Sequence, residues 1–444
     1  MTNVESSKAS SDWGAHALAG TNSPRWSPSS FVHNLMMTRM GRYGLAVIAP
    51  ASVAAVQLLL QLIVLHQVPA NEFGLYAFLT IIVQLGYGIS NALICTPFTV
   101  LLHRSAEESF DPRSFFTISL AYATLFGLMC LSIGKLFSPD NWIFLFALYG
   151  SLAMFRWFGR AYAYSNFKQF GAAGSDIIYA ASLLLCMGVL HVVGHLDLLY
   201  LSGALLLSTA LGLLVIGREF LKQQFLTSPV ASLASYKEVW REQSRWALLG
   251  VATTEATSNA HSYLVTAVAG PAAFAPLAAA AIFMKPVALA ITSLTQLERP
   301  AMSKALADGE SARANAVRKD FLLALISIWV VVTALTFVLL WLKPGIVAHQ
   351  GYSLFDLRLA AALLVAIALI QVWQSPNSVF LQAAKEFRML STFSVKACLF
   401  SLPLVAIAVL VFGPVYSLFG ILIGQTIMAI QISRQAKAWR LKNE

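Results

Sequence analysis

Apolar residues run in twelve long stretches between about Tyr43 and Ser433, and short polar connections separate them. A helix needs roughly 20 apolar residues to cross a bilayer. The pattern therefore predicts an all-α membrane protein with about 12 transmembrane helices. The predicted spans cover residues 43–66, 74–102, 113–136, 141–162, 172–194, 197–217, 246–269, 273–297, 320–342, 357–382, 391–412 and 414–433.

Lys and Arg are distributed unequally over the connections between these spans. Apart from Lys135, Lys343, Arg358 and Lys285, each of the 30 Lys and Arg residues falls at a terminus, in one set of alternate connections, or near the end of a span that adjoins such a connection. Cytoplasmic loops carry an excess of Lys and Arg, and this bias sets the orientation of a membrane protein. We therefore expect a multi-pass protein with both termini in the cytoplasm.

The composition excludes most soluble function classes. The chain is 58% hydrophobic and only 11% charged, whereas a soluble domain is roughly 25% charged. The net charge of +10 is explained by the orientation signal. No basic stripe is interleaved with stacking aromatics, so nucleic acid is not an expected partner.

The longest connection among the first seven spans divides the chain into two parallel six-span halves. The predicted organisation is a cytoplasmic tail with a short interfacial helix near 29–37 (1–42), an N-terminal six-helix bundle (43–217), a cytoplasmic linker (218–245), a C-terminal six-helix bundle (246–433) and a cytoplasmic C-terminal tail (434–444). The first outer turn of each half has a similar sequence, Pro69–Ala77 and Pro271–Ala278. Repeats of this kind are typical of transporters with a central cavity.

The seventh span carries polar residues on one helical face. Glu255, Ser258, Asn259 and Ser262 follow at i, i+3, i+4 and i+7. Lys285 lies near the middle of the eighth span, and ionisable groups within a bilayer usually face a cavity or a partner. The residues predict either a lumen-facing charged pair with a coupling-ion or proton role for Glu255, or a buried structural ion pair.

Thinner polar stripes mark three other spans. Gln57 and Gln61 are spaced i, i+4 in the first span. Asn91 ends a stripe with Gln84 and Tyr87, and Gln371 begins one with Gln374. These side chains can bind substrate hydroxyls or form hydrogen bonds between helices. Both interpretations remain open, and Asn91, Asn259 and Gln371 are candidate substrate-binding residues.

Arg156 and Arg160 are spaced i, i+4 near the inner end of the fourth span. Guanidinium groups at the headgroup level suit phosphate or pyrophosphate. The alternative is that they orient the span and extend their charged ends to the interface. With Lys285, they are the candidate binding groups for an anion.

Several other kinds of chemistry are not indicated. There is no phosphate-binding Gly-x-x-x-x-Gly-Lys-Ser/Thr motif. His and Cys residues are not spaced as metal ligands or as a disulfide framework. We expect no metal and no cofactor. The predicted outer loops are short, which argues against an enzyme such as a membrane glycosyltransferase or polymerase.

The run Val68–Ala77, the stretch Ser244–Trp246 and the turn Gly270–Ala273 resemble Wzx-type flippases of the multidrug/oligosaccharidyl-lipid/polysaccharide exporter (MOP) superfamily. The resemblance implies two six-helix bundles around a central, often cationic cavity in a bacterial inner membrane. It implies alternating access, driven by an ion or proton gradient. Only Lys285 is a clear mid-membrane cation here, which departs from a strongly cationic lumen.

The implied substrate is an undecaprenyl-pyrophosphate-linked oligosaccharide, translocated for exopolysaccharide, capsule or O-antigen assembly. Implied partners are this lipid-linked oligosaccharide, membrane lipids, and the polysaccharide polymerase and chain-length machinery. The first alternative is a multidrug or cation antiporter of the same superfamily. A lipid II flippase and a membrane enzyme acting on lipid-linked sugars are the others.

Overall fold

The computed structural model describes residues 39–102, 113–166, 168–226, 233–342, 353–384 and 386–443. Residues 46–444 form one compact unit, and the fold is described within it. The described regular elements are all helical, which confirms the predicted all-α fold. The expected interfacial helix near 29–37 lies outside the described residues.

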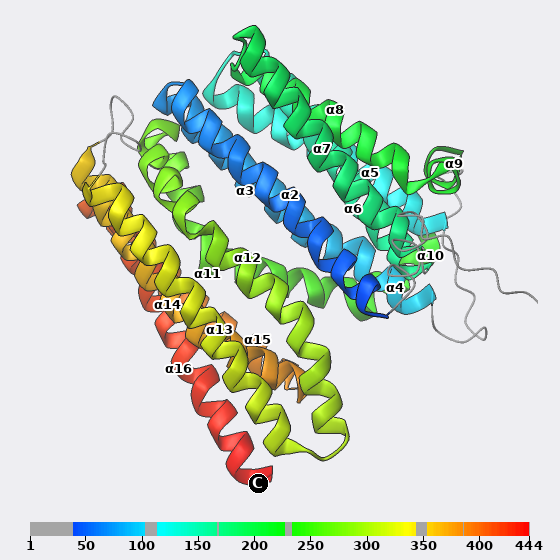
Figure 1. Cartoon of the computed structure of the whole chain (residues 1–444), viewed down its shortest axis with the longest axis vertical. Helices are drawn as coiled ribbons and strands as arrows, with labels where there is room; N and C mark the ends of the chain where they lie inside the picture. Colours follow the sequence, from blue (N-terminus) through cyan, green and yellow to red (C-terminus); the bar gives the residue numbers. More distant parts are fainter. Residues whose placement is uncertain are drawn as a thin grey trace, which may run out of the picture. The chain divides into compact units, whose positions relative to one another are not determined.

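The first half of the chain consists mostly of long helices (Figure 1). They are α2 (Arg39–Gln67), α3 (Ala70–Ser90), a π-helical turn η1 (Asn91–Cys95), α4 (Thr96–Leu102), α5 (Arg113–Phe137), α6 (Trp142–Ser165), α7 (Gln169–Val193) and α8 (Leu198–Ile216). Helix α6 packs along α5 and α8, and α8 packs along α7. The turn η1 continues α3 into α4 without a break in the helical path.

The predicted linker is itself largely helical. It contains α9 (Arg218–Leu226), α10 (Leu233–Val239) and a π-helical turn η2 (Trp240–Ser244). The Tyr236 hydroxyl donates to the carbonyl oxygen of Leu93 in η1 at 2.6 Å, and it lies 3.0 Å from the Ser244 hydroxyl. This hydrogen bond ties the connection to the π-helical turn after α3.

The second half repeats the pattern of long helices. They are α11 (Arg245–Ala269), α12 (Pro271–Ala307), α13 (Ser311–Phe337) continued by η3 (Val338–Leu342), α14 (Leu354–Ala383), α15 (Phe387–Ile407) continued by η5 (Ala408–Phe412), η6 (Pro414–Tyr416) and α16 (Ser417–Asn443). Helix α14 packs against α12 and α16, and α15 packs against α11 and α16.

Eleven of the described helices are long and apolar enough to cross a membrane, which indicates a multi-pass membrane protein. They correspond to every predicted span except 246–269. At that position α11 is helical over 25 residues, but its Thr, Ser, Asn, His and Glu residues make it too polar to meet the same criterion. A polar helix of spanning length must turn its polar face away from lipid.

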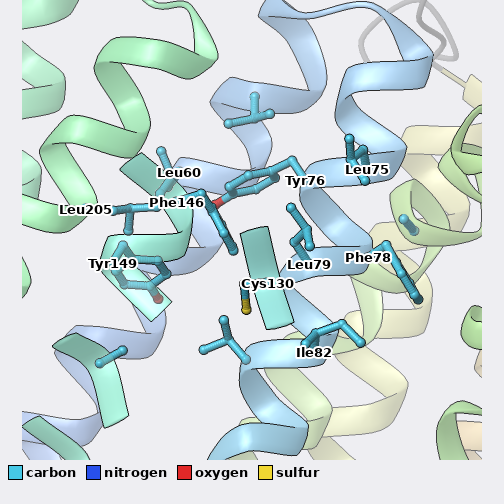
Figure 2. Close-up of a cluster of buried hydrophobic side chains, with 14 of the residues drawn as sticks. Leu60, Leu75, Tyr76, Phe78, Leu79, Ile82, Cys130, Phe146, Tyr149 and Leu205 are labelled. Atoms are coloured by element: carbon cyan, nitrogen blue, oxygen red, sulfur yellow. The ribbon is translucent and has the colours of Figure 1, made fainter. Parts of the chain in front are cut away.

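The core of the first half is aromatic (Figure 2). Tyr76 on α3 meets Phe146 on α6 edge to face, with ring centroids 5.9 Å apart. Phe146 also meets Tyr149, and Leu60 of α2 and Cys130 of α5 lie in the same cluster. Aromatic pairs in this geometry are favourable beyond the area they bury, so the cluster fixes α3 against α6.

A backbone contact joins the two halves at the similar turns noted in the sequence. A Cβ atom at Gly74 of α3 would overlap the carbonyl oxygen of Pro271, the first residue of α12. Next to it, the Phe78 ring meets Phe274 at 6.4 Å between centroids. Only glycine permits this approach, so the α3–α12 contact depends on one missing side chain.

We predict that Gly74→Ala destabilises the protein by about 1–3 kcal/mol, because the added methyl group meets backbone rather than a flexible side chain. The measurement is the thermal denaturation midpoint of the purified protein in detergent. Gly188→Ala on α7 is the matched control, since a Cβ there has no neighbour within 4 Å. Equal midpoints for the two variants would show that the close approach is not required.

Candidate functional site

A cavity of about 260 Å³ lies among α2, α3, α11, α12, α14 and α16. We call it the lysine cavity. Its polar lining consists of Gln61, Thr80, Gln84, Ser258, Asn259, His261, Ser262, Lys285 and Gln371. Among the described residues that line it, none is Asp or Glu and Lys285 is the only Lys or Arg. The cavity therefore combines one amine with neutral hydrogen-bonding groups.

Lys285 lies on α12, immediately before Pro286, and is half-buried. Its ammonium group donates to the side-chain oxygen of Gln61 on α2. An amide oxygen orients the ammonium but does not neutralise it. The cavity therefore holds a positive charge whose contact partner is neutral.

Glu255 does not pair with Lys285. One of its carboxylate oxygens accepts hydrogen bonds from the Tyr263 hydroxyl at 2.5 Å and from the Asn259 amide at 3.0 Å, both on α11. No ion pair links Glu255 to Lys285 in the part of the chain that the structure describes. The sequence prediction of a direct pair is wrong here, because donors at i+4 and i+8 satisfy the carboxylate on its own helix.

Two of the three predicted amide residues reach the lysine cavity. Asn259 and Gln371 line it, whereas Asn91 is exposed at the start of η1. The Asn91 side-chain oxygen accepts a hydrogen bond from the Trp157 indole N–H at 2.9 Å. The Trp157 ring stacks on Tyr87 with centroids 4.4 Å apart. Asn91 therefore joins η1 to α6.

Arg156 and Arg160 converge on a carboxylate that the sequence analysis did not single out. Asp176 of α7 is fully buried. Its two oxygens lie 2.5 Å from Arg156 Nη2 and 2.9 Å from Arg160 Nη2. Arg156 also donates to the Ser175 hydroxyl at 3.1 Å. Two guanidinium groups on one carboxylate leave the cluster with one net positive charge.

This arrangement corrects the prediction that both arginines serve an anion at the inner surface. Arg156 is only 7% exposed, and its guanidinium is held between Asp176 and the Tyr179 ring, 4.4 Å from the ring centroid. Arg160 keeps more exposure and lies over Trp157. The signal for Asp176 was available, because a carboxylate inside an apolar span requires a partner.

A second cavity of about 420 Å³ adjoins the first. Ser258, Ala288 and Gln371 line both. Its other polar lining residues are Thr254, Thr257, Thr292, Gln374, Ser375, Ser394 and Gln425. Every described residue that lines it is uncharged, and we call it the hydroxyl–amide cavity. Sequence stripes pointed to Gln374, whereas Thr257, Ser394 and Gln425 come together only through the packing of α11, α15 and α16.

No protein-family model and no curated protein matches this sequence. Solved structures do match. The inward-facing conformation of a multidrug resistance MATE family transporter of the MOP superfamily gives a TM-score of 0.62 at 14% identity, over 89% of this chain and 98% of that chain. The lipid II flippase MurJ in its inward closed conformation gives 0.65 at 14% identity, over 89% of each chain.

A MOP superfamily transporter from Pyrococcus furiosus, described by the reversed polarity of its binding pocket, gives a TM-score of 0.57 at 13% identity over 93% of this chain and 98% of that chain. At these identities the likeness shows the fold. The chain therefore has the fold of MOP superfamily transporters and flippases, as the sequence resemblance implied. Membership of the superfamily and the Wzx type both stay predictions.

We predict that Asp176→Asn destabilises the protein by roughly 3–5 kcal/mol, because it leaves two largely buried guanidinium groups without a counter-ion. The measurement is the thermal denaturation midpoint in detergent. Glu219→Gln is the control. It breaks the exposed Lys168–Glu219 ion pair, in which the ammonium lowers the pKa of Glu219, and exposed pairs contribute little. Similar midpoints for the two variants would contradict a structural role for Asp176.

Proposed function

We propose that this protein is a flippase that translocates undecaprenyl-pyrophosphate-linked oligosaccharide repeat units across the bacterial inner membrane for exopolysaccharide, capsule or O-antigen assembly. The supporting observation is the lysine cavity, in which a cation without a carboxylate partner lies among neutral amides and hydroxyls. The MOP transporter fold supplies the scaffold for alternating access.

The chemistry of the cavity fits an anionic glycolipid. Lys285 supplies three N–H donors and a positive charge for a pyrophosphate or an acidic sugar. Asn259 and Gln371 each offer both a donor and an acceptor, which suits sugar hydroxyls. Arg160, with part of its side chain exposed beside Trp157, and Asn91 are the groups of the first half that can meet the passing substrate.

The same lining disfavours a multidrug or cation antiporter. A cationic ligand in the lysine cavity would face the ammonium of Lys285, and no described lining residue carries a carboxylate. Like charges in a site of low dielectric constant repel strongly. Glu255 is engaged by Asn259 and Tyr263, so it is not presented as a free anion to such a ligand.

We assign the bundles 43–217 and 246–433 as the two bodies that rock during transport. Residues 218–245 are the cytoplasmic linker between them, and both termini lie in the cytoplasm. The tails 1–42 and 434–444 lie on that side. Partners of the proposed pathway are the lipid-linked oligosaccharide, membrane lipids, and the polymerase and chain-length machinery. Glu255 is assigned as the proton or coupling-ion site, because it is an ionisable group on the polar helix beside the cavity.

We predict that Lys285→Met reduces translocation at least tenfold and that Lys285→Arg retains most of it, because the substrate requires the charge. The measurement is the flipping of a fluorescent lipid-linked oligosaccharide in proteoliposomes. Lys222→Met on the exposed face of α9 is the matched control. Wild-type flipping by Lys285→Met, or drug-cation efflux without any glycolipid flipping, would overturn the proposal.

We predict that Glu255→Gln makes glycolipid flipping independent of an imposed pH gradient. The amide cannot exchange a proton, although it keeps an oxygen that can accept from Tyr263 and Asn259. Tyr263→Phe is the companion variant, which removes one donor and leaves the carboxylate. A pH-gradient response in Glu255→Gln equal to that of the wild type would exclude Glu255 as the proton site.

A further inference from the structure

The hydroxyl–amide cavity differs from the lysine cavity in carrying no charge at all. It is formed by α11, α12, α14, α15 and α16, and hydroxyl and amide side chains predominate over the apolar lining residues Ala288, Ile291 and Met428. A cavity inside a membrane protein is normally lined by apolar groups unless polar ones serve a ligand or water. The density of uncharged polar groups therefore requires an explanation.

Several of these groups have hydrogen-bonding capacity to spare. The side-chain oxygen of Gln374 is buried and has no hydrogen-bond partner among the described residues. The hydroxyls of Thr257 and Ser375 donate to backbone carbonyls of their own helices, at 2.8 Å and 2.6 Å. The Ser375 oxygen can accept further hydrogen bonds, and the Thr257 oxygen, which also interacts with the Cys398 thiol, keeps one free lone pair. Leaving a buried oxygen without a hydrogen bond is unfavourable, so a donating ligand is favoured.

We propose that the hydroxyl–amide cavity is a saccharide-binding compartment, which holds the uncharged sugar portion of a ligand whose anionic group lies at Lys285. This inference rests on the proposed function and specifies how the substrate is divided between the two cavities. Ser258 and Gln371, which line both cavities, form the junction. The linkage between sugar and phosphate lies at this junction.

The chemistry of the lining selects this ligand class. Each sugar hydroxyl both donates and accepts, so it can satisfy the acceptor oxygens of Thr257 and Gln374 and the donor amides in one ring. An apolar ligand would leave these groups unpaired, which costs affinity. A cation would find no carboxylate among the described lining residues. Of these three ligand classes, the neutral, hydroxyl-rich one matches the compartment.

The experiment is calorimetric titration of the full-length protein in lipid nanodiscs with N-acetylglucosamine 1-phosphate and with inorganic phosphate. We expect the sugar phosphate to bind roughly tenfold more tightly, the effect of one or two added hydrogen bonds. Thr257→Val and Gln374→Leu should each remove most of this preference while leaving phosphate affinity unchanged. Lys285→Met should lower the affinity for both ligands.

The matched controls are Thr333→Val and Gln431→Leu. Both wild-type side chains carry a buried oxygen without a hydrogen-bond partner in the described structure, as Gln374 does, but neither lines either cavity. They should keep the full preference for the sugar phosphate. Ser394→Ala on α15 is a third cavity variant with a small change in volume, for use if a larger change disturbs folding.

Equal binding of the two ligands by the wild type would overturn the compartment. Substitutions in the hydroxyl–amide cavity that weaken phosphate binding as much as sugar-phosphate binding would also overturn it. The flipping assay separates this inference from the proposed function. If the protein flips glycolipid but binds the two ligands equally, the saccharide compartment is wrong and the proposed function is retained. If the protein prefers the sugar phosphate but does not flip glycolipid, the proposed function is wrong and the cavity remains a saccharide-binding site.

Discussion

The cost of an ionisable group inside the bilayer is the constraint on which this structure depends. The chain meets it in two ways. In the first half, Arg156 and Arg160 share the fully buried carboxylate of Asp176, so one of the two positive charges is neutralised at contact distance. In the second half, the hydrogen-bond partner of Lys285 among the described residues is the neutral side-chain oxygen of Gln61. The first solution stabilises helices α6 and α7 against each other, and the second leaves a charge available for a ligand.

The two solutions are connected through helix α3. Its Gly74 end packs against the backbone of α12, which carries Lys285. Further along, Gln84 lines the lysine cavity and Tyr87 stacks on Trp157 of α6. Helix α3 therefore packs against Trp157, over which Arg160 lies, and also lines the cavity that contains Lys285. Movement of α3 would alter the packing at both, which suits the alternating access of the proposed function.

Much of the fold could be predicted from the sequence because spanning length and apolarity are local properties. The exception was α11, where Glu255 and its polar neighbours make the helix too polar for that criterion. Lys285, Asn259 and Gln371 were predicted as lining residues from their positions in spans, and they share a cavity. The partners could not be predicted. Gln61 lies far from Lys285 in the sequence, and Asp176 lies 20 residues from Arg156; only the packing of helices brings each pair together.

A single cation beside an uncharged compartment discriminates between anionic ligands more strongly than a wholly cationic cavity does. A surface of many lysines would bind any polyanion, because Coulomb attraction depends little on ligand shape. One amine supplies modest attraction, and the remaining affinity must come from hydrogen bonds that only a correctly placed polyol can form. A ligand lacking those hydroxyls leaves the oxygens of Thr257 and Gln374 unpaired, and this penalty discriminates more sharply than attraction does. The departure from a strongly cationic lumen is therefore consistent with selection of a particular glycan through its sugar rather than through its phosphate.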